Sequence, residues 1–205
     1  MKLKLILLLC LTSGFSIAQS NSFMYKKQSN IGAYGSIVTK YSNLNGFDAF
    51  LIGGRGGIIL NKTLNLGMGL YGLASIVPID VTDASGNILG KDRLHFMYGG
   101  FEVEYMINNK RKLHYSISTM IGLGTVASRN NNKVYPENYF DHNRLNNFFF
   151  VAEPEFNVMW KFAKYLHVSL GISYLQTIGA KYEFLDDSSL SGFNGILSFH
   201  FKSGQ

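Results

Sequence analysis

The stretch 50–76, FLIGGRGGIILNKTLNLGMGLYGLASI, constrains the fold of this chain more than any other. Apolar residues and glycines occupy every second position of its first half, and Arg55 lies on the opposite side. After the polar residues 61–63 the alternation resumes, which predicts a β-hairpin with one apolar face. Each arm is about twice the usual soluble strand length of roughly 5–6 residues, but matches a tilted membrane-crossing strand of roughly 9–11.

The same alternation recurs along the rest of the chain. We predict strands at 31–41, 50–60, 64–76, 94–107, 113–127, 147–160, 165–176 and 191–202. Short turns alternate in most cases with longer loops, of which 77–93, 128–146 and 177–190 are rich in loop residues. An even strand count with short turns at one end and long loops at the other is typical of outer-membrane barrels. The predicted fold class is all-β, an eight-stranded antiparallel up-and-down transmembrane β-barrel over 31–202.

The N-terminal segment has the features of an export signal. Lys2 and Lys4 precede an apolar run, and Ser16-Ile17-Ala18 forms a small-x-Ala cleavage site. We therefore expect residues 1–18 to be a signal peptide, 19–30 a polar lead-in and 203–205 a short tail. Cys10 lies inside the signal, so no disulfide and no cysteine-based metal site is expected in the mature chain. No cofactor is expected either.

Charge separates the two faces of the predicted strands. The apolar face carries no Lys, Arg, Asp or Glu, whereas the other face carries Lys40, Arg55, Glu102, Glu104, Glu153 and Glu155. An Arg or Lys facing the middle of a bilayer costs on the order of 2–4 kcal/mol, so this distribution suits a lipid-facing exterior. A secreted soluble barrel of lipocalin type is the alternative, but its exterior should be rich in charged residues and threonine. Aromatic residues gather at both predicted strand ends, as expected at two membrane interfaces: Tyr105, Tyr115, Trp160, Phe199 and Phe201 at the turn end, and Tyr41, Phe50, Phe148, Tyr174 and Phe193 at the loop end.

Three motifs carry a resemblance to known proteins: GGRGG at 53–57, VAEPEFNV at 151–158 with Trp160, and LGISY at 170–174. Through them the chain resembles the small outer-membrane barrels of the OmpA transmembrane domain and OmpX type, and a group of exported eight-stranded barrels without assigned function. The resemblance implies insertion into the outer membrane of a Gram-negative cell envelope by the barrel-assembly machinery, with both termini in the periplasm. The chain departs from the pattern at its end, because Phe201 is followed by four more residues and Ile196 stands where a glycine is expected.

The inward charges form the first candidate site: Arg55, Glu102, Glu104, Glu153 and Glu155. The guanidinium of one arginine can donate hydrogen bonds to several carboxylates, and together these side chains can fill the lumen of an eight-stranded barrel. The sharper alternative is a narrow cation or proton path along these carboxylates. Pro154, between two of them, removes a ladder hydrogen-bond donor from a strand without a free edge, which predicts a β-bulge or local water contact.

Three histidines, His114, His167 and His200, are predicted to face inward near the periplasmic mouth. Imidazoles with a nearby carboxylate such as Glu104 could bind a transition metal, although no local ligand spacing ties them together. A lipid A-modifying enzyme on this fold would need a lipid-facing His and Ser two residues apart. His95 is predicted to face outward, but the residue two positions on is Met97.

The loops and turns offer surfaces for interaction. In loop 128–146, Tyr135, Tyr139, Phe140 and His142 are candidates for contact with an extracellular protein or glycan, and suit a solvated loop equally well. The short turns carry lysines and arginine without an acid, which could hold anionic headgroups or cell-wall polymer. Nucleic acid is excluded as a partner by export. These features predict a non-enzymatic outer-membrane barrel with a filled lumen that acts structurally or through its loops.

Overall fold

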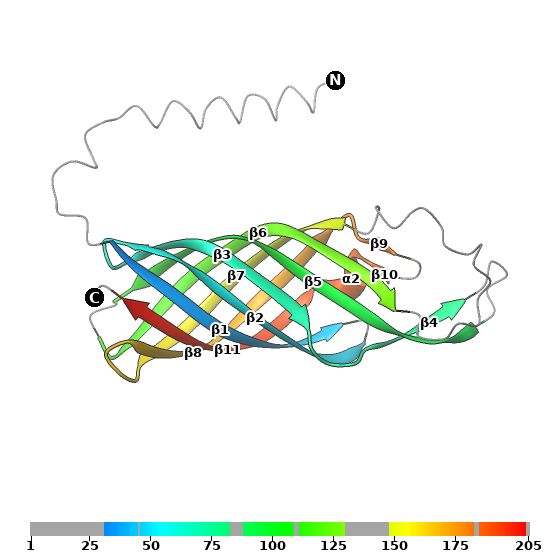
Figure 1. Cartoon of the computed structure of the whole chain (residues 1–205), viewed down its shortest axis with the longest axis horizontal. Coiled ribbons are helices and arrows are strands. Elements are labelled where there is room, and N and C mark those ends of the chain that lie inside the picture. The colour runs from blue at the N-terminus through cyan, green and yellow to red at the C-terminus, as the bar shows by residue number, and fades with distance from the viewer. Residues whose placement is uncertain are drawn as a thin grey trace, which may run out of the picture.

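A computed structural model describes residues 31–44, 46–82, 88–108, 111–129, 148–182 and 185–203. Eight long antiparallel strands form a closed barrel (Figure 1). They are β1 (Ile31–Leu44), β2 (Phe47–Leu60), β3 (Leu64–Leu73), β5 (Ile88–Ile107), β6 (Leu113–Arg129), β7 (Phe148–Lys161), β8 (Leu166–Ile178) and β11 (Gly192–Ser203). Shorter elements at the loop end are β4 (Pro78–Thr82), β9 (Lys181–Tyr182), β10 (Leu185–Asp186) and α2 (Asp187–Leu190). Within the described ranges, no helix has the length and apolar character needed to span a bilayer.

The barrel closes through two antiparallel ladders. β1 pairs with β11 from Ala33 opposite Ser203 to Tyr41 opposite Gly195. β3 pairs with β5, where Leu64 lies opposite Tyr105. Each long strand therefore has two neighbours, so the wall exposes no row of unpaired backbone groups to lipid. The predicted fold class is confirmed.

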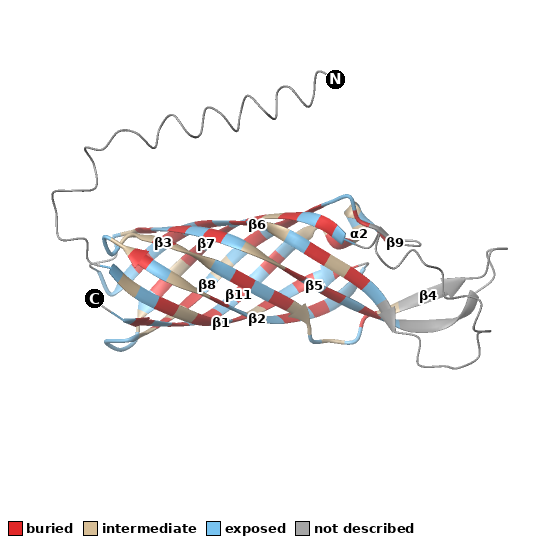
Figure 2. Cartoon of the chain, turned by 45° about the horizontal axis from the view of Figure 1, so that its top comes forward, coloured by how far each residue is buried: buried red, intermediate tan, exposed pale blue. Residues whose placement is uncertain are grey.

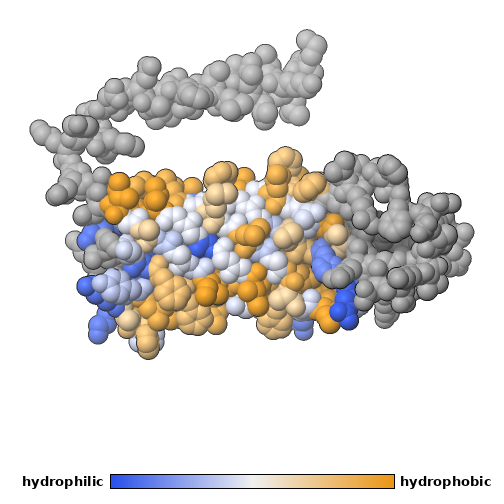
Figure 3. All heavy atoms as spheres, viewed as in Figure 1, coloured by the Kyte–Doolittle hydropathy of each residue, from blue (hydrophilic) through white to orange (hydrophobic). Residues whose placement is uncertain are grey.

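Burial alternates along the strands as the sequence predicts (Figure 2). All six inward charges named above, including Lys40 and Arg55, are buried. The outward positions carry large exposed apolar side chains, such as Phe101 at 71% and Ile121 at 65% exposure. On the face seen in Figure 3, orange and near-white residues cover most of the surface between the two ends, and most of the blue residues lie near the ends. This arrangement is the reverse of a lipocalin-type soluble barrel, whose apolar side chains lie inside.

Two exposed aromatic sets mark the limits of the belt formed by these outward apolar side chains. All ten aromatic residues predicted for the two girdles are exposed on the outer wall, from Tyr174 at 37% to Phe193 at 75%. Tyr41 packs on Phe50 at the loop end with ring centroids 5.3 Å apart, and Tyr115 stacks on Phe156 toward the turn end at 6.1 Å. Rings at these two levels suit the two headgroup regions of a bilayer.

The loop end contains more regular structure than the sequence predicts. The segment 77–93 was expected to be irregular, but β4 pairs there with an extension of β5 that begins at Ile88. Pro78 is the first residue of β4, a position where a missing backbone donor is tolerated. The predicted loop 177–190 likewise contains β9, β10 and the single turn α2. Conversely, β3 ends at Leu73, before the predicted 76.

Of the two outcomes predicted at Pro154, a β-bulge or a local water contact, the β-bulge does not form. On one side Pro154 lies opposite Thr119 of β6 in regular register. On the other, Ala152 pairs with Gln176 and Glu155 with Ser173, so the register with β8 is the same before and after the proline. The missing donor therefore interrupts the ladder without adding a residue to the strand.

Glycines allow close contact between β5 and β6, where Gly100 lies opposite Gly122. A Cβ atom on Gly122 would collide with the carbonyl oxygen of Gly99 and with Gly100 Cα. We expect Gly122→Ala to destabilise the barrel by about 1–3 kcal/mol, because the backbone must shift to admit the methyl group. Gly35→Ala is the matched control, since a Cβ there meets nothing within 4 Å. Urea unfolding of both variants in lipid vesicles measures the difference, and equal midpoints would contradict the close packing.

Candidate functional site

The inside of the barrel divides into three zones along its axis. An outer apolar zone around Phe96 and Phe149 lies at the loop end. An ion-pair zone with Lys40, Arg55 and the buried glutamates lies in the middle, and a histidine zone with His114, His167 and His200 lies at the turn end. The outer apolar zone belongs to one buried cluster, in which Phe96 stacks on Phe149 with centroids 5.7 Å apart. Its other members near the strand ends include Leu44, Ala49, Leu51, Leu94, Val126, Val151 and Leu175. The sequence patterns give these residues inward parity, except for Leu44, which was predicted to lie in a turn but belongs to β1. They did not reveal that these residues gather into an apolar plug.

The described parts of the connection between β8 and β11, residues 179–182 and 185–191, cover the outer apolar zone and are called the lid here. Ala180, Leu185 and Leu190 are buried in the same apolar cluster. Asp187 fastens the lid, because its carboxylate accepts hydrogen bonds from the backbone N–H groups of Gly179 at 3.0 Å and Ala180 at 2.7 Å. Sequence reasoning read this segment as a loop. The sequence feature that indicates its burial is the pair Leu185 and Leu190, which flanks the polar run DDSS.

Asp186 begins the helical turn of the lid as its N-cap. Its carboxylate accepts hydrogen bonds from Ser188 Oγ at 2.7 Å and from Ser189 N at 3.0 Å. These hydrogen bonds stabilise the charged form and lower the pKa of Asp186 to about 2. The cap therefore remains ionised throughout the neutral and mildly acidic range.

The ion-pair zone is built around Arg55. Its Nη1 lies 2.7 Å from Glu102 Oε1 and 2.8 Å from Glu155 Oε1, and all three side chains are buried. Asn157 Nδ2 donates a further hydrogen bond of 2.6 Å to Glu155 Oε1. Three strands, β2, β5 and β7, are thus tied together across the lumen by one guanidinium group. The structure brings these three predicted site residues together.

Glu153 belongs to a separate group centred on Lys40. The sequence pattern predicted that Lys40 faces inward, but Lys40 was not part of the predicted candidate site. Lys40 Nζ lies 2.7 Å from Glu153 Oε2 and 3.7 Å from the centre of the Tyr71 ring. Glu153 also accepts hydrogen bonds from Tyr98 at 3.0 Å, Ser173 at 2.6 Å and Asn194 at 3.0 Å. Glu104 lies apart from both groups and accepts a hydrogen bond of 2.5 Å from Asn65.

Several buried polar atoms of the ion-pair zone have no hydrogen-bond partner among the described protein groups. They include Arg55 Nε and Nη2, Glu102 Oε2 and Glu104 Oε1. Buried polar atoms are normally paired with protein or with water. The ion-pair zone is therefore a polar compartment that suits hydration, and the outer apolar zone separates it from the loop end.

In the histidine zone the structure pairs two of the three predicted histidines. The rings of His114 and His167 lie edge to face with centroids 5.3 Å apart. His200 instead shares its two ring nitrogens between Ser36 Oγ at 2.7 Å and Ser169 Oγ at 2.9 Å. Among the described residues, no group of three His, Cys, Asp or Glu side chains is arranged to hold a metal ion.

Lys202 is a further inward cation that sequence reasoning did not count. It is 2% exposed, and its Nζ lies 3.0 Å from Met106 Sδ. Its position follows from the parity of β11, since it lies two residues beyond inward-facing His200.

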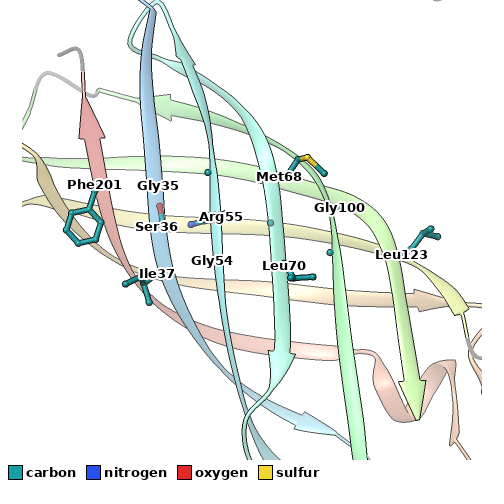
Figure 4. Close-up of a pocket in the computed structure, with 13 residues that line it drawn as sticks. Gly35, Ser36, Ile37, Gly54, Arg55, Met68, Leu70, Gly100, Leu123 and Phe201 are labelled. Atoms are coloured by element: carbon teal, nitrogen blue, oxygen red, sulfur yellow. The ribbon is translucent and has the colours of Figure 1, made fainter.

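A hollow of about 860 Å³ lies on the wall formed by β11, β1, β2, β3, β5 and β6 (Figure 4). Its glycines, including Gly35, Gly54 and Gly56, leave the backbone uncovered, whereas Ile37, Met68, Leu70, Leu123 and Phe201 project around it. The outward positions of these side chains place the hollow on the lipid-facing side. Arg55, the titratable residue in its lining, forms ion pairs with Glu102 and Glu155 in the lumen.

The remaining candidates lie on the outer wall or outside the described residues. His95 is exposed, as predicted. Its partner across the ladder is Ala127, and the residue two positions on is Met97, and neither of these side chains is a nucleophile. The loop candidates Tyr135, Tyr139, Phe140 and His142 lie outside the described residues, as do the signal segment and the lead-in.

No protein-family model matches the sequence, and no curated protein is significantly similar to it. Among solved structures, Neisserial surface protein A is similar with a TM-score of 0.54 and 9% identity, over 86% of this chain and 98% of that one. The outer membrane protein OprG from Pseudomonas aeruginosa has a TM-score of 0.48 and 9% identity, over 85% of this chain and 96% of that one. The attachment invasion locus protein Ail of Yersinia pestis has a TM-score of 0.41 and 10% identity, over 84% of this chain and 97% of that one. The likeness to Neisserial surface protein A and the closed ladder of eight strands show the fold of a small outer-membrane β-barrel, as the resemblance in the sequence implies.

Proposed function

We propose that this protein is a non-enzymatic barrel of the outer membrane that serves a structural or surface-interaction role through its extracellular loops. The apolar outer belt and its two aromatic limits support the membrane location. The ends of the barrel domain lie together at the turn end, where Ala33 pairs with Ser203. In this proposal the turn end faces the periplasm and the lid faces outward.

The observation that carries the proposal is the filled lumen. The apolar cluster with the lid occupies the outer part, and the ion pairs of Lys40 and Arg55 cross the middle. An eight-stranded barrel is only wide enough to be filled by side chains, so these contacts leave little room for ion passage. Interaction through the loops is then the remaining route to function.

A narrow cation or proton path is the second candidate. It is favoured by the excess of buried carboxylates in the ion-pair zone and by the polar atoms there without protein partners. Such a path would require displacement of the lid, because the outer apolar zone is lined mainly by apolar side chains, which cannot replace the water around an ion.

Planar-bilayer conductance separates the two candidates. We expect the wild-type protein to give no discrete conductance steps, and the lid variant Leu185→Ser/Leu190→Ser to remain closed because Phe96 and Phe149 stack beneath the lid. Cation-selective steps that disappear in Glu102→Gln/Glu155→Gln would contradict the filled lumen and establish the path. The same preparations must show folded barrel by circular dichroism.

A glycan array probed with the protein in nanodiscs tests the interaction role. The matched control replaces residues 131–145 by a Gly-Ser linker and leaves the eight described strands unchanged. Binding by the wild type that is lost in the control supports recognition through this loop. Equal binding by both proteins would contradict it.

A further inference from the structure

Four cationic side chains gather on two neighbouring turns at the turn end. Arg111, Lys112, Lys161 and Lys164 form this set, which we call the basic turn patch. The turns lie side by side, because the backbone N–H of Lys161 donates to the carbonyl of Lys112 at 2.8 Å. Arg111, Lys112 and Lys164 are exposed and Lys161 is partly exposed. The turn sequences NNKRK (108–112) and KFAKY (161–165) contain no Asp or Glu.

The basic turn patch lacks a protein counter-charge among the described side chains. The aspartates in the described ranges are Asp48, Asp80, Asp92, Asp186 and Asp187, and all of them belong to loop-end segments of the barrel. Like charges on adjacent strand ends repel one another, so their juxtaposition is unfavourable unless an anion lies between them. The compensating charge must therefore come from the surroundings.

Aromatic side chains fix the depth of the patch relative to the membrane. Trp160, Phe162 and Tyr165 are exposed by 60%, 72% and 57%, and Lys164 Nζ lies 5.1 Å from the centre of the Tyr165 ring. Exposed aromatic rings at a barrel rim lie at the level of the lipid headgroups. The cations between them therefore lie at headgroup depth, within reach of lipid phosphates.

We propose that the basic turn patch binds the headgroups of anionic phospholipids in the adjoining leaflet. Ammonium and guanidinium groups donate charge-assisted hydrogen bonds to phosphate oxygens, and the flanking rings pack on the glycerol and upper acyl region. Cell-wall polymer is the other anion on this side, but it lies beyond the headgroup level at which the aromatic rings place the patch. The inference rests on the membrane location proposed above.

Trp160 is the one tryptophan of the chain and lies beside the basic turn patch, opposite Leu113 and next to Lys161, so its fluorescence reports on the neighbouring lipids. In proteoliposomes, brominated phosphatidylglycerol should quench its fluorescence at a lower mole fraction than brominated phosphatidylcholine. We expect a preference on the order of fivefold for each cation that contacts a headgroup. In ~1 M salt the preference should largely vanish, because the screening length falls to about 3 Å.

The decisive variant is Lys112→Gln/Lys161→Gln, with Lys112→Arg/Lys161→Arg as the control that keeps both charges. The glutamine variant should lose most of the preference and the arginine variant should keep it. Equal quenching by the two lipids in the wild type, or an unchanged preference in the glutamine variant, would overturn the proposal. Pull-down by purified peptidoglycan that depends on the two lysines, without lipid preference, would assign the patch to cell-wall polymer instead. Quenching by brominated phosphatidylcholine tests membrane insertion separately, since it requires only that Trp160 contact lipid.

Discussion

Arg55→Met should destabilise the barrel by about 3–5 kcal/mol, the cost typical of breaking a buried ion pair by removing one partner. The substitution leaves Glu102 and Glu155 buried without the guanidinium that now lies 2.7 and 2.8 Å from them. The two carboxylates also repel each other once the cation between them is gone. Equilibrium unfolding by urea, followed through Trp160 fluorescence in lipid vesicles, measures the change.

The triple variant Arg55→Met/Glu102→Gln/Glu155→Gln is the control for this prediction. It removes all three charges together, so we expect it to recover most of the lost stability. Asn157 can still donate a hydrogen bond to the amide oxygen of the new glutamine at 155. If Arg55→Met and the triple variant were equally unstable, the loss would come from side-chain packing and not from unpaired carboxylates. A change of less than about 1 kcal/mol in Arg55→Met would mean that water already compensates the carboxylates.

Ile121→Arg should cost about 2–4 kcal/mol in a bilayer, the penalty for a cation on the lipid face near the midplane. Ile121 is 65% exposed at the middle of β6, between Phe101 of β5 and Ala152 of β7. Leu113→Arg is the matched control, because Leu113 begins the same strand at the turn end and is 50% exposed. There we expect a cost of about 0–1 kcal/mol, since the guanidinium can reach the headgroups.

Urea unfolding in vesicles of both variants tests this depth dependence. Equal costs at positions 113 and 121 would contradict a membrane-spanning orientation with Ile121 near the centre. A soluble barrel would instead gain solubility from either arginine and would lose little stability, because a solvated surface tolerates charge.

The period-two pattern predicted the barrel wall, the strand count and the facing of six inward charges, but it left out the inward Lys202. It succeeded because lipid excludes charge from one face of every strand and closure requires every strand to be paired. In the site, the pattern grouped Arg55 with Glu102 and Glu155, whose equal heights follow from counting residues from the turns. It did not separate Glu153 from them, because the contact with Lys40 depends on the stagger between strands that are far apart in sequence.

The lid and the apolar plug could not be predicted from alternation. Residues such as Leu94, Phe96 and Val151 obey the same inward parity as the glutamates, and only the assembled barrel shows that they meet at one end. Ala180, Leu185 and Leu190 lie in a segment dominated by polar residues, where periodicity carries no signal. Their burial depends on the barrel mouth beneath them, which is a tertiary and not a local property.

The seam between β1 and β11 also constrains how the protein can be made. Ser36 and His200 meet there although 164 positions separate them along the chain. Until β11 has been synthesised and docked, both β1 and the growing final strand present unpaired edges, which invite association with other chains. With the proposed membrane location, we therefore expect these edges to need shielding from other chains until the last strand arrives, so that closure of the barrel is a single all-or-none step.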